Sequence, residues 1–208
     1  MQTVHLADAL QQSRHLQDGG LSMPGADDLT RIAQAHGYGG LNLRSLAEQV
    51  GIKAASLYHH FSSKADLAAA VARRYWEDAA ARLEALTVAL PDPLERLRQY
   101  PQTFRMSLEI DNRMCLSSFM GAEYDDLPDV VMKEVHAFAD VNVQWLAKTI
   151  IEARITEPKD AGQRAHAIFA AVAGAQLVAR SRSDIALFDA TIESCQAAGL
   201  FGSGSVTG

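Results

Sequence analysis

Apolar residues recur every three or four positions along most of the chain. Leu67, Val71, Tyr75 and Ala79 are spaced four apart, as on one face of an α-helix. Three further stripes have helical spacing: Val131, Val135, Phe138, Val141, Trp145 and Ile150; Ile168, Val172, Ala175 and Ala179; and Ile185, Phe188, Ile192 and Cys195. Sustained alternation of polar and apolar residues, which would indicate strands, is absent. The pattern predicts an all-α fold of eight to ten helices.

Glycine and proline clusters divide this pattern into segments. They lie at positions 37–40, 51, 91–93, 128 and 158, and a serine-rich break follows at 181–183. We expect helices over residues 26–36, 64–90, 163–181 and 183–198. Residues 1–25 form either a loose arm or an additional docked helix. Residues 202–208 are rich in Gly and Ser and are expected to form a flexible tail.

The composition is that of a globular chain. Of 208 residues, 48% are hydrophobic and 21% charged, which excludes a disordered chain or a disulfide scaffold. No apolar run approaches the roughly 18 residues that span a bilayer, and the N-terminus lacks a secretory signal pattern. We therefore expect a cytoplasmic protein with no membrane partner. Cys115 and Cys195 are expected to be thiols there.

Charge is distributed unevenly. The chain has a net charge of −6, but residues 28–75 carry six basic and three acidic side chains, a net charge of +3. Residues 76–208 carry 12 basic and 19 acidic side chains, a net charge of −7. A basic module beside a larger acidic one is typical of a nucleic-acid contact confined to one part of a chain.

The basic module contains the pattern of a helix-turn-helix. Asn42 is placed to cap a helix whose apolar residues are Leu43, Leu46, Ala47 and Val50. Gly51 follows where a sharp turn is needed, and a short second helix has Ile52, Leu57 and Phe61 as its buried positions. Ser63 and Asp66 then have a spacing close to that of a capping box at the start of the next helix.

A longer run of residues makes this pattern specific. It consists of Gly37-Tyr38-x-Gly40-x-Asn42-Leu43-Arg44-x-Leu46-Ala47-x-x-Val50-Gly51-Ile52, then Ser56-Leu57-Tyr58-His59-His60-Phe61, then Ser63-Lys64-x-x-Leu67. In these residues the chain resembles the TetR family of bacterial transcriptional regulators. The resemblance implies an N-terminal DNA-binding domain, expected at 26–75, and a larger helical domain for ligand binding and dimerisation, expected at 76–201.

The resemblance also implies which residues meet DNA. The second helix of the motif would enter the major groove of double-stranded DNA, while the start of the first helix and the lysine of the next would reach the phosphate backbone. The implied DNA-binding residues are Asn42, Arg44, Lys53, Ser56, Tyr58, His59 and Lys64. Lys53 is one residue away from the position at which the family usually has its lysine. We consider Lys53 the best candidate for a base contact, since lysine can donate to guanine.

In the larger domain, the resemblance implies a small-molecule effector and a homodimer that binds a palindromic operator, most simply as a repressor. Aromatic and sulfur-containing side chains predict the effector site, because they adapt to apolar ligands. These residues are Phe104, Met106, Cys115, Phe119, Met120, Tyr124, Phe138 and Trp145. The last two helices would form the dimer interface through Phe169, Val172, Leu177, Ile185, Phe188 and Ile192.

Three alternatives bear on this hypothesis. Cys115 next to Arg113 is either a reactive thiol or a buried small apolar residue, and the second interpretation is preferred. Glu123, Asp125 and Asp126 have no nucleophile nearby in the sequence and are interpreted as a solvated loop. An all-α small-molecule-binding protein or enzyme with an incidental helix-turn-helix would not need the 58–64 run. We predict no enzyme activity, catalytic residue, metal or cofactor.

Overall fold

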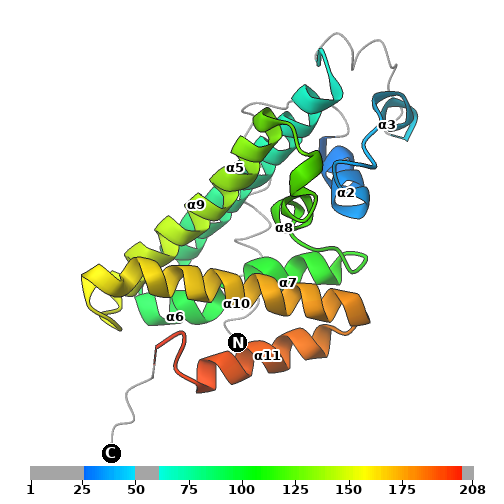
Figure 1. The fold of residues 1–208 in the computed structure, drawn as a ribbon. Coiled ribbons are helices and arrows are strands. Elements are labelled where there is room, and N and C mark those ends of the chain that lie inside the picture. Colours follow the sequence, from blue (N-terminus) through cyan, green and yellow to red (C-terminus); the bar gives the residue numbers. More distant parts are fainter. Residues whose placement is uncertain (1–25, 50–60, 203–208) are drawn as a thin grey trace, which may run out of the picture. The chain divides into compact units, whose positions relative to one another are not determined.

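A computed structural model describes residues 26–49 and 61–202. Within these ranges the chain forms nine α-helices and two short 3-10 helices, with no strand. The helices are α2 (Ala26–His36), α3 (Leu43–Gln49), α5 (Lys64–Ala89), α6 (Pro93–Gln99), α7 (Gln102–Glu109), α8 (Leu116–Gly121), α9 (Asp129–Glu152), α10 (Ala161–Arg182) and α11 (Ile185–Ala197). The 3-10 helices are η2 (Tyr124–Asp126) and η3 (Pro158–Asp160). The predicted all-α fold class is confirmed (Figure 1).

The helix ends follow the polar residues that the sequence placed there. The Asn42 side chain accepts hydrogen bonds from the backbone N–H groups of Arg44 and Ser45, at 3.0 and 3.1 Å, and so caps α3 as predicted. Ser63 Oγ accepts from the Asp66 N–H at 3.1 Å and donates to the Asp66 carboxylate at 2.8 Å. These bonds set the start of α5 at Lys64, the predicted residue.

Helix α8 is short. It ends at Gly121 because the next N–H groups bond three residues back instead of four: Ala122 donates to Phe119 O and Glu123 to Met120 O. The chain then continues into η2. The serine-rich break differs slightly from the prediction, since α10 extends to Arg182 and ends where Ser183 takes a left-handed conformation, with φ of 52°.

The described residues divide into two compact units. The N-terminal unit combines residues 26–49 and 61–78 with residues 115–139, and the C-terminal unit combines residues 79–114 with residues 140–202. Helices α5 and α9 each contribute their first part to the N-terminal unit and their second part to the C-terminal unit.

The core of the N-terminal unit is apolar and is shared by segments far apart in the sequence. Helix α2 contributes Leu29 and Ala33, and α8 contributes Leu116 and Met120. The other buried members come from α3, α5, α9 and nearby loops: Leu41, Leu43, Ala47, Phe61, Leu67, Ala68, Val71, Ala72, Leu127 and Val131. A fully buried leucine or methionine stabilises a fold by about 1.5–3 kcal/mol, so α8 is an integral part of this core.

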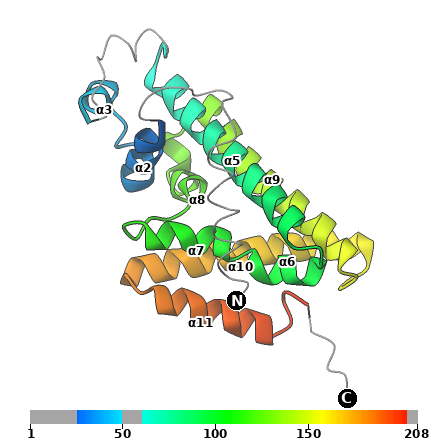
Figure 2. The ribbon, with the colours of Figure 1, turned by 180° about the vertical axis from the view of Figure 1, so that it is seen from behind.

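In the C-terminal unit, α10 and α11 run side by side, and α7 packs against both (Figure 2). Ile168, Val172 and Ala179 of α10 and Phe188 of α11 are almost completely buried. Arg105 of α7 forms hydrogen bonds at 2.7 and 3.0 Å to both carboxylate oxygens of Asp189 on α11. The buried apolar residues and the bidentate ion pair hold α11 against α10 and α7.

Candidate nucleic-acid interface and effector region

The start of α3 presents a positive side chain to solvent. Arg44 has 82% of its side chain exposed, and its guanidinium lies 3.7 Å from the equally accessible carboxylate of Glu48. An exposed ion pair at this distance contributes little stability. Arg44 can therefore leave Glu48 for a DNA phosphate at small cost, as the resemblance implies.

Lys64, at the first position of α5, contacts the turn between α2 and α3. Its ammonium lies 4.3 Å above the centre of the Tyr38 ring and donates to the backbone carbonyl of Gly39 at 3.3 Å. Burial raises the pKa of the Tyr38 hydroxyl, which keeps the ring neutral. The structure thus gives Lys64 an intramolecular partner in addition to its predicted phosphate contact.

The other predicted DNA-binding residues lie outside the described part of the chain. They are Lys53, Ser56, Tyr58 and His59, all within residues 50–60. Their roles remain predictions that rest on the sequence.

A buried carboxylate connects α5 to α9 within the N-terminal unit. Glu134 of α9 is 4% exposed. Its Oε1 accepts from Arg73 Nε at 3.2 Å and Nη2 at 2.7 Å, and its Oε2 accepts from Trp76 Nε1 at 2.8 Å. Burial opposes ionisation of Glu134, but the hydrogen bonds from Arg73 and Trp76 and the charge of Arg73 outweigh it, so its pKa is lowered. This link was not predictable from the sequence, because Glu134 lies within an apolar helical pattern.

Five of the predicted effector residues belong to the N-terminal unit: Cys115, Phe119, Met120, Tyr124 and Phe138. Cys115 and Phe138 both contact Tyr75, through its hydroxyl and its ring respectively, and the two rings are 5.4 Å apart. Met120 is buried in the shared core, Phe119 is half-buried, and Tyr124 is 59% exposed.

Cys115 has the environment of an unreactive thiol. Its side chain is buried, and burial raises its pKa despite hydrogen bonds from the Ser118 amide, the Ser118 hydroxyl and the Tyr75 hydroxyl. Because the thiolate is the reactive form, this environment favours the interpretation of Cys115 as a buried small apolar residue.

The other three predicted effector residues, Phe104, Met106 and Trp145, belong to the C-terminal unit. The sequence analysis missed Tyr100, which joins two of them. Its ring lies 5.7 Å from that of Phe104 and is stacked at 5.8 Å on that of Trp145. Its buried hydroxyl donates to Asn142 Oδ1 at 2.9 Å. Met106 is half-buried and lies two residues after Phe104 on α7.

The predicted dimer-interface residues fall into two classes. Val172, Phe188 and Ile192 are buried within the chain's own core, and Phe169 packs edge-on against Phe104 at 6.1 Å. Ile185 is half-buried, whereas Leu177 is 53% exposed, next to the similarly exposed Val178. Of these residues, Leu177 therefore offers the most surface to a partner.

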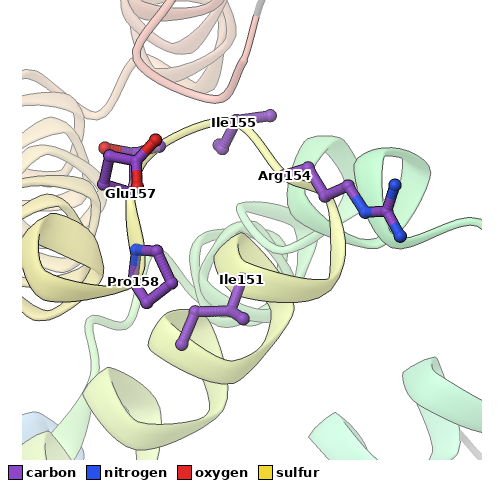
Figure 3. Close-up of a pocket in the computed structure, with 6 residues that line it drawn as sticks. Ile151, Arg154, Ile155, Glu157 and Pro158 are labelled. Atoms are coloured by element: carbon purple, nitrogen blue, oxygen red, sulfur yellow. The ribbon is translucent and has the colours of Figure 1, made fainter.

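A surface hollow lies at the end of α9, and none of its lining residues is a predicted site residue. It has a volume of about 610 Å³ and is lined by Ile151, Arg154, Ile155, Thr156, Glu157 and Pro158 (Figure 3). Among residues 26–49 and 61–202, the hollow included, no group of His, Cys, Asp and Glu side chains has the arrangement of a metal site. None of the described helices combines the length and apolar character needed to cross a membrane.

Comparisons with known proteins agree with this architecture. Residues 29–71 match the family model described as bacterial regulatory proteins, tetR family. No curated protein sequence matches the chain.

Solved structures match over most of the chain. A TetR-family transcriptional regulator from Agrobacterium tumefaciens is 28% identical, with a TM-score of 0.75 over 83% of this chain and 96% of that one. A TetR regulator from Legionella pneumophila is 20% identical, with a TM-score of 0.78 over 88% and 99%. The regulator FadR from Bacillus subtilis, solved in complex with stearoyl-CoA, is 16% identical, with a TM-score of 0.62 over 81% and 94%.

The predicted family is therefore confirmed by two independent observations. The helix-turn-helix segment matches the family model, and the helices that follow it have the arrangement of solved family members. Residues 29–71 carry the DNA-binding segment of the TetR family of bacterial transcriptional regulators, and the chain is similar to a solved TetR-family regulator over 83% of its length.

Proposed function

We propose that the chain is a ligand-responsive repressor that binds a palindromic operator as a homodimer and is released by a small molecule bound among its C-terminal helices. The observation that supports it most is the family-matched segment 29–71, in which the exposed Arg44 and the α5 residue Lys64 flank the predicted recognition helix. Two copies of this segment would read two half-sites, which requires a dimer.

Selection of bound sequences from a random duplex library, at near-physiological salt, tests operator binding. We expect a palindrome, and a pool without any enriched sequence would contradict the proposal. On the selected duplex, Tyr58→Ala and Arg44→Ala should weaken binding, whereas Arg154→Ala, an exposed arginine of the C-terminal unit, should not.

The salt dependence of binding separates the two partners of Lys64. The logarithm of the binding constant falls with the logarithm of the salt concentration, by about 0.9 for each phosphate neutralised in duplex DNA. If Lys64 binds phosphate, Lys64→Ala should reduce this slope by about that amount. An unchanged slope with weaker binding would assign Lys64 to the α2–α3 turn alone.

The proposed homodimer uses the exposed surfaces of α10 and α11. Exposed residues at helical spacing on α10 are Ala167, Ala170, Gly174, Leu177 and Val178, and those on α11 are Ala186, Ala190 and Ala197. Small side chains allow two helix pairs to approach closely. Leu177→Glu should shift the protein to monomers in sedimentation velocity, whereas Glu84→Lys, an exposed site on α5, should leave the dimer intact.

The eight predicted effector residues form two groups, five in the N-terminal unit and three in the C-terminal unit, and either group is a candidate for the effector site. FadR, a regulator with a similar fold, was solved in complex with stearoyl-CoA, which supports small-molecule binding as a proposal for this chain. The chain has two tryptophans, so Trp76→Phe leaves Trp145, beside Tyr100, as the single tryptophan, whose fluorescence can be excited selectively. We expect an effector to change this fluorescence and to dissociate the operator complex over the same concentration range, since both report one binding event.

Substitutions in the two groups test which of them binds the effector. Met106→Ala should weaken effector binding if the C-terminal group lines the site, and Phe119→Ala should do so if the N-terminal group does. Unchanged effector affinity in both variants would contradict the predicted set.

A further inference from the structure

The turn between α2 and α3 is wound tightly and depends on glycine. Gly37 has a φ of 63°, and its N–H donates to Ala33 O at 2.8 Å, which ends α2. Gly40 donates to His36 O at 3.0 Å, and a Cβ at Gly40 would lie 2.7 Å from that same oxygen. The turn leads directly to Asn42, which caps α3. Its conformation therefore sets where the helix-turn-helix begins.

A carboxylate from another part of the chain occupies this turn. Glu123 Oε2 accepts from the N–H of Tyr38 at 2.6 Å, and Oε1 accepts from the N–H of Gly39 at 3.1 Å. These are two successive backbone donors on one anion, an arrangement that favours negative charge. The fit is close, because a Cβ at Gly37 would lie 2.6 Å from the carboxylate carbon of Glu123.

Glu123 is anchored to α8. Its N–H donates to Met120 O at 2.9 Å, and Met120 is buried in the core that α8 shares with Leu29 and Ala33 of α2. The carboxylate therefore has a fixed base within the N-terminal unit. It also lies well outside the family-matched segment 29–71.

The interpretation of residues 123–126 as a solvated loop is thus wrong for one residue. Asp125 and Asp126 are exposed, but Glu123 is half-buried and bound to the turn. A positive charge contacts the same turn, because the ammonium of Lys64 donates to the carbonyl of Gly39. An anion thus holds the turn's N–H groups and a cation holds one of its carbonyls.

We propose that Glu123 is a positioning residue for operator binding: its carboxylate fixes the α2–α3 turn and so holds α3 in the orientation that DNA requires. The proposal rests on the proposed function, because it assigns Glu123 a role in that same DNA-binding site. Glu123 touches no DNA in this role. It acts through Tyr38 and Gly39.

Electrostatics alone predicts the opposite effect of its removal. Deleting a negative charge from a DNA-binding unit strengthens attraction to phosphate, so affinity should rise slightly. If Glu123 fixes the turn, Glu123→Gln should instead lower affinity. Asp126→Asn is the matched control, since it removes the same charge from an exposed position three residues away.

The experiment measures two properties of the full-length wild-type, Glu123→Gln and Asp126→Asn proteins. The first is amide hydrogen exchange at Tyr38 and Gly39 without DNA. We expect about tenfold faster exchange in Glu123→Gln, since one acceptor oxygen becomes an NH2 group and the other loses its charge, and no change in Asp126→Asn. The second is affinity for the duplex selected by the wild-type protein. We expect a drop of about tenfold in Glu123→Gln with an unchanged salt slope, because no phosphate contact is lost.

Two results would overturn the proposal: unchanged exchange at the turn, or faster exchange with operator affinity equal to that of Asp126→Asn. If Glu123→Gln unfolds, Glu123→Asp replaces it, because it keeps the charge and shortens the reach. It should speed exchange at Tyr38 and Gly39 and lower operator affinity relative to Asp126→Asn, and exchange and affinity equal to those of Asp126→Asn would overturn the proposal. If the wild-type protein selects no duplex, the proposed function fails, while exchange at Tyr38 and Gly39 still decides whether Glu123 fixes the turn.

Discussion

The two units differ in the buried hydrogen bonds that connect segments far apart in sequence. In the N-terminal unit the acceptor is a carboxylate, whereas in the C-terminal unit donor and acceptor are both neutral. In the N-terminal unit, the Glu134 carboxylate accepts hydrogen bonds from Arg73 and Trp76. In the C-terminal unit, Tyr100 donates to Asn142 at 2.9 Å, and Gln176 Nε2 donates to the backbone carbonyl of Phe104 at 2.6 Å. The ion pairs Arg96–Glu152, Arg105–Asp189 and Arg105–Glu109 of the C-terminal unit have carboxylates that are more than a third exposed.

This difference indicates which unit's stability depends more on the ionisation of a buried group. A buried carboxylate stays ionised only while its donors remain in place, so it ties the packing of α5 on α9 to the ionic conditions. Neutral buried hydrogen bonds impose no such dependence. The proposed DNA-binding unit should therefore be the more sensitive of the two to charge-changing substitutions and to acid.

The largest effect is expected from removing the buried carboxylate. Glu134→Ala leaves Arg73 and the indole N–H of Trp76 without their acceptor and should lower the free energy of unfolding by about 3 kcal/mol. Asn142→Ala, the neutral counterpart, should lower it by about 1–2 kcal/mol. Urea unfolding followed by circular dichroism measures both, with the exposed Glu193→Ala as control. Equal losses in the two variants would remove the contrast between the units.

A second test compares glycines. Gly37→Ala places a side chain at positive φ and against Glu123, so it should destabilise the protein by about 2 kcal/mol. Gly162 lies in the first turn of α10 with nothing within 4 Å of an added Cβ. Gly162→Ala should therefore stabilise by about 0.4–1 kcal/mol. Thermal unfolding of both variants checks the opposite signs, and a harmless Gly37→Ala would contradict the close fit of the turn.

A third test compares how the stability of variants in the two units depends on pH. The folded-state pKa of Glu134 lies below the ordinary value of about 4.3 for an unfolded chain, so its contribution to stability is present above that value. It is lost as the pH falls through the folded-state pKa. The stability difference between wild type and Glu134→Gln should therefore shrink below about pH 4. Urea midpoints measured from pH 7 to pH 3 test this, with Asn142→Ala expected to keep a constant difference.

The smallest effect concerns the two thiols. Burial raises the pKa of Cys115, whereas Cys195 of the C-terminal unit is partly exposed. A disulfide reagent at neutral pH should modify Cys195 at least about tenfold faster than Cys115. Single-cysteine variants, Cys115→Ser and Cys195→Ser, allow each rate to be followed separately. Fast modification of Cys115 in the folded protein would restore the reactive-thiol interpretation.

Much of the fold was predictable because its signals are local. Glycine and proline breaks predicted the bounds of α2, the Ser63–Asp66 spacing predicted the start of α5, and Asn42 caps α3 as its position indicated. The family followed from the consecutive residues between Gly37 and Leu67.

The links between distant segments were not predictable in the same way. Glu123 lies 85 residues from Tyr38, among acidic neighbours that indicate a solvated loop, so only the folded chain shows its partner. Tyr75 and Tyr100 each join two predicted effector residues, but a tyrosine in an apolar stripe looks like any other core residue. Val172 and Phe188 are apolar at helical spacing, a pattern that a chain's own core and a dimer face share.

The attachment of Glu123 to the α2–α3 turn has a consequence for protein engineering. Hybrid regulators, in which a DNA-reading module is transplanted onto a foreign sensor, are most simply cut at the end of the matched segment. Such a cut in this chain would leave behind the carboxylate at position 123 and the α8 side chains that complete the core. A transplant that carries residues 115–139 along with residues 26–78 keeps those contacts. The exchangeable part of this regulator is therefore discontinuous in sequence, and its boundaries follow contacts rather than chain order.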